Sequence, residues 1–233
     1  MTKLRLADFR RVAFFTGAGL SSESGIPTYR GSGGVWREYD YQEYACQEAF
    51  ERDAEKVWDF HDKRREAVAA AEPNEGHRII ARHQAAHPET AIITQNIDGL
   101  HQRAGAERVM ELHGSLWRVR CERERTVRDD LSVPMAQRKC SCGAYLRPDI
   151  TWFGDRLDEA VIGRAVERLA SCDLIVSIGT SGVVFPAADL PRIAVSSGAV
   201  SVEINLEDTP VSHLYQHHLR APASEALAVL AGA

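Results

Sequence analysis

"RVAFFTGAGLSSESGIPTYRG" occupies residues 11–31 and decides the fold. It opens with a short and almost wholly apolar run, which is typical of a strand covered on both faces of a parallel sheet. Gly17 and Gly19 follow at once, a spacing that permits a tight turn and a close approach of the backbone to a pyrophosphate. Because position 22 is serine, the third glycine of the dinucleotide-binding fingerprint is missing. A plain strand-to-loop turn therefore explains the two glycines equally well.

The loop that continues this stretch favours the nucleotide interpretation. Pro27, Tyr29 and Arg30 place an aromatic ring and a fixed cation directly beside the glycine turn. Both groups suit a flexible lid over a nucleotide.

Strand-like and helix-like runs alternate along the rest of the chain. Such alternation predicts an α/β fold with a doubly wound, Rossmann-like parallel sheet. The expected strands are residues 11–16, 90–96, 108–113, 173–179 and 199–205, and the expected helices are 55–70, 74–86, 158–171, 186–197 and 222–231.

Two segments interrupt the alternation. Residues 31–87 are helical and charged, and residues 118–145 are rich in turns, charges and cysteines. We expect them to form a smaller lobe, a helical module plus a cysteine-containing loop module, inserted into one catalytic domain that spans residues 1–233. The larger lobe then comprises about 1–30, 88–117 and 146–233.

Composition narrows the class of protein. A chain of 233 residues buries enough surface to need no disulfides, and its net charge of −5 argues against a nucleic-acid partner. No stretch is apolar enough to span a membrane, and the N-terminal apolar run is too short for a secretory leader. Five cysteines are an odd number. We therefore expect a reduced, cytoplasmic protein.

A second polar loop follows the strand at 90–96. Gln95, Asn96 and Asp98 lie at its carboxyl end, the edge where open α/β sheets bind ligands, and together could hold an amide and ribose hydroxyls. Helix capping by Asn96 or Asp98 explains one of the three, but not all. His113 closes the next strand, where it is a candidate base near neutral pH, although a lone histidine is more often structural.

Two later loops complete the edge. Gly179, Thr180 and Ser181 follow the strand at 173–179, and Asn205 follows the last strand. We expect them to meet the adenosine half of the ligand. In isolation they are ordinary turn residues.

In this order, the motifs GAG-x-S, SGIPTYRG, TQNID, HG, LRP with WFG, GTS and NLE resemble the sirtuin family of NAD-dependent protein-lysine deacylases. The resemblance runs from residue 12 to about 224. It implies an NAD cofactor in the cleft between the lobes and an acylated lysine of a protein substrate entering by a tunnel. The cofactor-binding residues it implies are Gly17, Ala18, Gly19, Ser21, Tyr29, Arg30, Gln95, Asn96, Ile97, Asp98, Gly179, Thr180, Ser181, Asn205, Leu206, Glu207 and Ala223.

The resemblance also implies a mechanism. Nicotinamide leaves the ribose, the acyl oxygen attacks the exposed carbon, and His113 acts as general base for the ribose hydroxyls. Asn96 and Asp98 orient the ribose and the nicotinamide amide, and the products are nicotinamide, free lysine and O-acyl-ADP-ribose. Position 29 is usually phenylalanine in the family and is tyrosine here.

Acyl preference follows from the helix expected at 55–70. His61 and Arg64 lie on its apolar face, and an inward arginine needs an anionic partner. The stretch resembles the desuccinylase and demalonylase branch of sirtuins, where a Tyr-x-x-Arg pair binds the acyl carboxylate. Here the tyrosine is histidine, which could still donate a hydrogen bond. The alternative is that Arg64 pairs with Asp59, Asp62 or Glu66, which would leave a plain deacetylase.

Family resemblance further implies that the substrate backbone pairs as a strand between two segments of this chain. The residues concerned are Trp152, Phe153, Gly154, Gly182 and Val183.

Cysteines at 118–145 raise the question of a metal. Sirtuins commonly hold a structural zinc with two C-x-x-C pairs, whereas here Cys121 is followed by Glu124, and Cys140 and Cys142 form a C-x-C. Three thiolates and a carboxylate could make a tetrahedral zinc site. The alternative is a decayed site in a loop held by packing alone.

Other functions remain open on the same scaffold. A hydride-transferring oxidoreductase would need a third glycine and an acidic residue after the second strand, and neither is evident. An ADP-ribosyltransferase or NAD glycohydrolase would use the same NAD residues. A non-catalytic acyl-lysine-binding module would be expected to lose Asn96 or His113, and both are present.

Overall fold

A six-stranded parallel sheet forms the centre of the computed structural model, which describes residues 4–29 and 34–232. The strand order is β3-β2-β1-β7-β8-β9. Its strands are β1 (Val12–Thr16), β2 (Ala91–Thr94), β3 (Val109–Glu111), β7 (Leu174–Ile178), β8 (Val200–Ile204) and β9 (His217–Leu219). The five expected strands are confirmed. The sixth, β9, was not predicted because a three-residue edge strand with two exposed histidines has no hydrophobic pattern.

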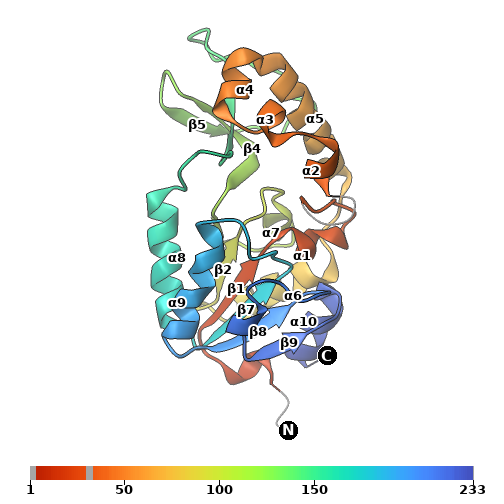
Figure 1. The fold of residues 1–233 in the computed structure, drawn as a ribbon, viewed down its shortest axis with the longest axis vertical. Helices are drawn as coiled ribbons and strands as arrows, with labels where there is room; N and C mark the ends of the chain where they lie inside the picture. The colour runs from red at the N-terminus through yellow and green to blue at the C-terminus, as the bar shows by residue number, and fades with distance from the viewer. Residues whose placement is uncertain (1–3, 30–33, 233) are drawn as a thin grey trace.

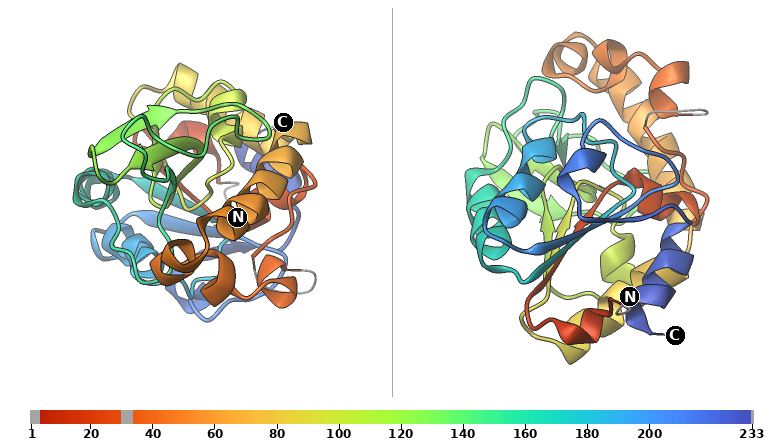
Figure 2. Two further views of the ribbon diagram at one scale, coloured as in Figure 1. Left: turned by 90° about the horizontal axis from the view of Figure 1, so that it is seen from above. Right: turned by 60° about the horizontal axis from the view of Figure 1, so that its bottom comes forward.

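Helices cover both faces of this sheet (Figures 1 and 2). One face packs against α6 (Glu75–Ala86) and α10 (Ala223–Ala231), and the other against α8 (Glu159–Ser171) and α9 (Leu190–Ser196). Strand β1 shows why both faces are apolar. Phe14 belongs to the first core and its neighbours Ala13 and Phe15 to the second, since successive side chains point to opposite faces.

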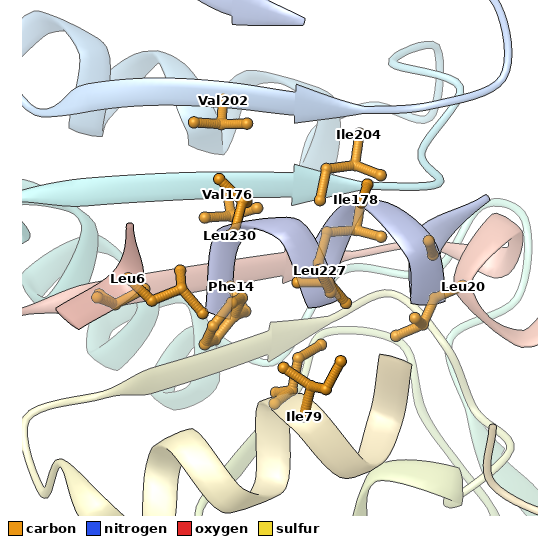
Figure 3. Close-up of a cluster of buried hydrophobic side chains, with 14 of the residues drawn as sticks. Leu6, Phe14, Leu20, Ile79, Val176, Ile178, Val202, Ile204, Leu227 and Leu230 are labelled. Atoms are coloured by element: carbon orange, nitrogen blue, oxygen red, sulfur yellow. The ribbon is translucent and has the colours of Figure 1, made fainter. Parts of the chain in front are cut away.

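The core on the α6 and α10 face fixes these helices in place (Figure 3). Phe14, Val176 and Ile178 from the strands pack with Ile79 of α6 and Leu227 of α10. Fully burying one such side chain stabilises the fold by ~1.5–3 kcal/mol. Helix α6 thus packs on the large sheet, which corrects its assignment to the small lobe, the segment 31–87.

The small lobe combines short helices with a sheet of its own (Figure 1). Strand order in this antiparallel sheet is β5-β4-β6. Its elements are α2 (Val35–Glu38), α3 (Tyr41–Tyr44), α4 (Gln47–Arg52), α5 (Ala54–Ala70), β4 (Gly114–Cys121), β5 (Thr126–Asp129) and β6 (Arg147–Ile150). The expectation of a cysteine-containing loop module at 118–145 is therefore wrong in part, because the segment includes strand structure. The β4–β5 hairpin was not predicted, because β5 is exposed and charged and therefore has no apolar pattern.

A separate apolar core holds the small lobe together. Val57 and Trp58 of α5 pack with Val119 of β4, Leu146 and Trp152. The Trp58 indole N–H donates to the Leu146 carbonyl at 2.7 Å. This core fixes α5, and with it the residues that α5 presents to the neighbouring cavity.

The remaining elements are short helical turns outside the two sheets. They are η1 (Leu6–Asp8), α1 (Ala18–Ser22), α7 (Leu100–Arg103), η2 (Ala187–Asp189) and η3 (Ser212–Leu214). Among the described residues, no helix combines the length and the apolar character needed to cross a membrane.

Candidate active site

A cavity of about 1160 Å³ lies at the carboxyl ends of the large sheet and reaches the small lobe. The sequence-predicted residues that line it come from loops and helix ends far apart in the chain and from helix α5. They are Gly17, Ala18, Gly19, Tyr29, His61, Arg64, Gln95, Asn96, Ile97, His113, Trp152, Phe153, Gly154, Gly179, Thr180, Ser181, Val183, Asn205, Leu206, Glu207 and Ala223.

Among the described residues, three of the predicted cofactor- and substrate-binding residues do not line this cavity. Ser21 and Asp98 are buried behind it, next to a much smaller hollow of about 10 Å³. Gly182 lies in the loop after β7 with a φ of +66°, and it faces the side chain of Val211. Arg30 lies outside the described residues.

The glycine turn after β1 packs against the loop after β7. A Cβ on Gly19 would lie 2.6 Å from the Gly179 Cα, closer than real side chains come. The Gly17 and Gly19 amides donate to the Ile178 and Gly179 carbonyls at 2.9 and 2.8 Å. These two glycines therefore serve the contact between two loops of the site, which the two-glycine pattern by itself did not reveal.

Gln95 and Asn96 connect the loop after β2 to its neighbours. The Gln95 amide donates to the Thr180 hydroxyl at 3.0 Å, and the Asn96 amide donates to the Gly17 carbonyl at 3.0 Å. The loops after β1, β2 and β7 are thereby fixed relative to one another.

Asp98 has a structural task as well. Its carboxylate accepts a hydrogen bond from the Ser21 hydroxyl at 2.7 Å and one from the Leu100 amide at 2.9 Å. The second bond closes a turn over two residues just before α7, whose N-cap residue is Gly99 without a side-chain cap, so the capping alternative is wrong for Asp98. Burial raises the pKa of Asp98.

His113 lies in the two-residue turn between β3 and β4, not at the end of a strand. Its Nδ1 is 2.9 Å from the Gln95 carbonyl oxygen. Because a carbonyl only accepts, Nδ1 carries the proton and Nε2 has a free lone pair. Burial lowers the pKa of His113, so the neutral ring predominates at pH 7. A neutral imidazole with an unprotonated Nε2 is a competent general base.

His61 and Arg64 line the small-lobe end of the cavity. The His61 ring is 3% exposed, stacks on Trp152 at 5.9 Å, and has no side-chain hydrogen-bond partner among the described residues. Burial, followed by the nearby charge of Arg64, lowers the pKa of His61 to about 3. His61 is therefore a neutral polar group.

Arg64 has no carboxylate partner among the residues that the structure describes. Its Nη2 donates to the Tyr29 hydroxyl at 3.0 Å, and its Nε is buried without a partner. Asp59 and Asp62, which the alternative offered as partners, both pair with Arg138 instead. Among the described residues, no carboxylate lies within ion-pair distance of this cation, and its charge acts from further away on Asp98, whose pKa is raised by burial and lowered in part by this charge.

Cys121, Glu124, Cys140 and Cys142 converge at the turn end of the β4–β5 hairpin. Their ligand atoms all lie within 4.8 Å of one another, and the Sγ atoms of Cys121 and Cys142 are 3.6 Å apart. Tetrahedral zinc with sulfur and oxygen ligands separates its donors by ~3.5–3.8 Å. The four residues therefore fit a tetrahedral zinc ion.

A tight turn makes the C-x-C spacing workable. The Gly143 amide donates to the Cys140 carbonyl at 2.9 Å, and Gly143 adopts a φ of +84°. The turn brings both thiols to one side, so a C-x-C can supply two corners of a site.

The sequence did not predict several aromatic residues that line the cavity, nor the residue that follows Glu207 in the loop after β8. Trp36 and Phe60 line the cavity, and so do Asp208 and Phe185. Phe60 precedes His61 on the apolar face of the helix expected at 55–70. The apolar pattern predicted that this face is buried, but not that Phe60 lines the cavity. The others carry no pattern that separates them from ordinary loop residues.

Fold and site together define a doubly wound α/β protein with an inserted second lobe and a nucleotide-sized cleft between them. The family model described as Sir2 family matches residues 17–186. The "NAD-dependent protein deacylase" of Aquifex aeolicus is 43% identical over 219 residues, which cover 93% of this chain and 92% of that protein. The chain therefore belongs to the Sir2 family, the family to which its motifs show resemblance.

Solved structures agree with this assignment. A crystal structure described as a Sir2 homologue–NAD complex matches with a TM-score of 0.90 at 41% identity, covering 97% of this chain and 90% of that one. A Sir2 complex with a deacetylated p53 peptide and 3′-O-acetyl-ADP-ribose matches with a TM-score of 0.87 at 31% identity, covering 97% and 94%.

Proposed function

We propose that this Sir2-family chain is an NAD-dependent protein-lysine deacylase that prefers acidic acyl groups, succinyl and malonyl, and also removes acetyl. The observation that carries the acyl preference is the Arg64 guanidinium, which faces the cavity with a hydroxyl and no carboxylate as its side-chain partner. A cytoplasmic location, expected from the cysteines, stays a prediction.

The residues at the sheet edge fit NAD. Gln95, Asn96 and Thr180 line the cavity with polar groups, which hydrogen bonds between neighbouring loops hold in place. The aromatic ring of Tyr29 lines the same cavity. When bound, NAD supplies a ribose carbon activated by departure of nicotinamide. His113 then accepts a proton at Nε2 from a ribose hydroxyl, and its bond to Gln95 holds the ring in the required tautomer. Tyr29 excludes water from the reacting carbon.

Acyl selection belongs to α5. A charged guanidinium partly removed from water is stabilised when an anion binds to it, and such a charge-assisted bond is worth ~1.5–3 kcal/mol. This corresponds to a preference of roughly 10–100-fold for a carboxylate-bearing acyl chain over acetyl. Acetyl-lysine still fits, because a smaller group enters the same space.

The decisive experiment compares succinyl-, malonyl- and acetyl-lysine versions of one peptide. In the intact protein, kcat/KM should be higher for the two acidic acyl groups. Arg64→Met should remove most of that advantage, about tenfold or more. Lys63→Met is the matched control, because it removes a positive charge from the exposed side of the same helix and should leave the ranking unchanged.

Equal kcat/KM for succinyl and acetyl peptides in the intact protein would refute the acidic-acyl preference. Nicotinamide release without any peptide would instead favour an NAD glycohydrolase. No release under any condition would favour an acyl-lysine-binding module.

We also propose that Cys121, Glu124, Cys140 and Cys142 hold one structural zinc ion. The convergence of their donor atoms supports this proposal. The residues would brace the β4–β5 hairpin against the Cys140–Gly143 turn. None of the four lines the large cavity, so the metal takes no part in the reaction.

A further inference from the structure

The hydrogen-bond partner of Arg64 is the Tyr29 hydroxyl, which comes from the segment that follows β1 and α1. We propose that the Tyr29 hydroxyl is a specificity-determining group, which together with Arg64 binds the carboxylate of an acidic acyl chain. The inference rests on the proposed acidic-acyl activity and assigns the second donor of that site. It places this donor on the loop after β1, not at position 61 of α5.

Contact geometry between the two side chains supports the assignment. The Arg64 Nη2 donates to the Tyr29 Oη at 3.0 Å, and the guanidinium lies 4.7 Å from the centre of the Tyr29 ring. Both residues line the large cavity. Since the hydroxyl oxygen is the acceptor in this bond, its own hydrogen remains free to donate to a third group.

The protonation state agrees with donation. Burial raises the pKa of Tyr29, so the phenol keeps its proton at neutral pH. The guanidinium stays charged. One charged donor and one neutral donor side by side match the two oxygens of a carboxylate.

A series of aromatic contacts fixes the position of Tyr29 relative to α5. The Tyr29 ring contacts Trp36 at 5.7 Å, and Trp36 stacks on Phe60 at 6.2 Å. Phe60 lies one helical turn before Arg64 on α5. The Trp36 amide also donates to the Tyr29 carbonyl at 3.2 Å. These contacts position the hydroxyl for the guanidinium without any substrate.

His61 is the weaker candidate for the second donor. Its pKa of about 3 leaves a neutral ring with a single N–H, and neither ring nitrogen has a hydrogen-bond partner among the described residues, whereas the Tyr29 hydroxyl is already bonded to Arg64. The other nitrogen then presents a lone pair, which cannot donate to an anion. A phenylalanine at position 29 would shield the reacting carbon from water equally well. The hydroxyl therefore has a use other than shielding.

The test is Tyr29→Phe, which keeps the ring and removes only the hydroxyl. The ratio of kcat/KM for succinyl peptide to kcat/KM for acetyl peptide should fall about tenfold, mostly through a higher KM for the succinyl peptide. A ratio avoids any assumption about the absolute rate. Tyr39→Phe is the matched control, since Tyr39 contacts Phe60 in the same aromatic cluster but does not line the cavity. Its ratio should stay at the value of the intact protein.

Comparison with Arg64→Met separates this inference from the proposed function. A lower ratio in both Tyr29→Phe and Arg64→Met supports the two-donor site. A ratio that falls in Arg64→Met but not in Tyr29→Phe overturns the role of the hydroxyl and leaves the proposed function intact. If the intact protein shows no preference for succinyl, the proposed function fails, and the inference fails with it.

Discussion

The tautomer and the charge of the His113 imidazole depend on one hydrogen bond and on burial. The bond from Nδ1 to the Gln95 carbonyl fixes the tautomer, and burial lowers the pKa. A histidine in the same turn but exposed to water would be partly protonated near neutral pH. The sequence placed His113 at the correct edge of the sheet, but only the structure shows which nitrogen is free.

We predict that His113→Ala reduces kcat/KM by about 10²–10⁴-fold, because it removes the general base. In the intact enzyme, kcat/KM should be flat from pH 7 to 8 and should fall only below pH 6.5, as protonation of His113 occupies Nε2. Steady-state rates over this pH range, with a peptide substrate, check both statements. An acidic limb centred above pH 7 would contradict the lowered pKa.

At the scale of elements, the site is built from loops at the carboxyl edge of the large sheet and from one helix of the small lobe. The β4–β5 hairpin lies apart from this cleft and meets the Cys140–Gly143 turn at the four-residue cluster. Sequence spacing alone left the cluster undecided between a zinc site and a decayed one. The converging sulfur and carboxylate atoms favour the zinc site.

We predict that the purified protein contains one zinc ion per chain by elemental analysis. Glu124→Ala should weaken zinc retention during dialysis against a chelator by roughly 10–100-fold, since it removes one corner of the tetrahedron. Asp129→Ala is the control, because it removes an exposed carboxylate from the same hairpin. Protein isolated without chelators and found free of metal would count against the site.

For the whole molecule, the buried histidines set the response to acid. His61, His77 and His101 are at most 3% exposed, and burial is the largest cause that lowers their pKa values, to about 3, 3 and 4. In the unfolded chain each takes up a proton near pH 6.5. Between pH 6.5 and these lowered values the unfolded state therefore binds more protons, and stability is lost as the pH falls.

We predict that the free energy of unfolding drops by on the order of 1 kcal/mol per histidine for each pH unit below 6.5. For a protein of this size, each kcal/mol lowers Tm by about 2–4 °C. Thermal melts at pH 7, 6 and 5 check this. His101→Asn should flatten the slope, whereas His217→Asn, an exposed position on β9, should not. A Tm that is constant from pH 7 to 5 would be the contrary result.

Apolar periodicity and motif order in the sequence determined the doubly wound sheet, five of its six strands and about half of the residues around the cleft. These patterns are local, so a short window of residues contains them. Tertiary structure alone decided that Gly19 faces Gly179, that Arg64 meets Tyr29 and no acidic residue, and that α6 packs on the large sheet. Each of these contacts joins atoms that are many residues apart in the chain. Packing of the folded chain sets the distances between them, so a short window of sequence cannot predict them.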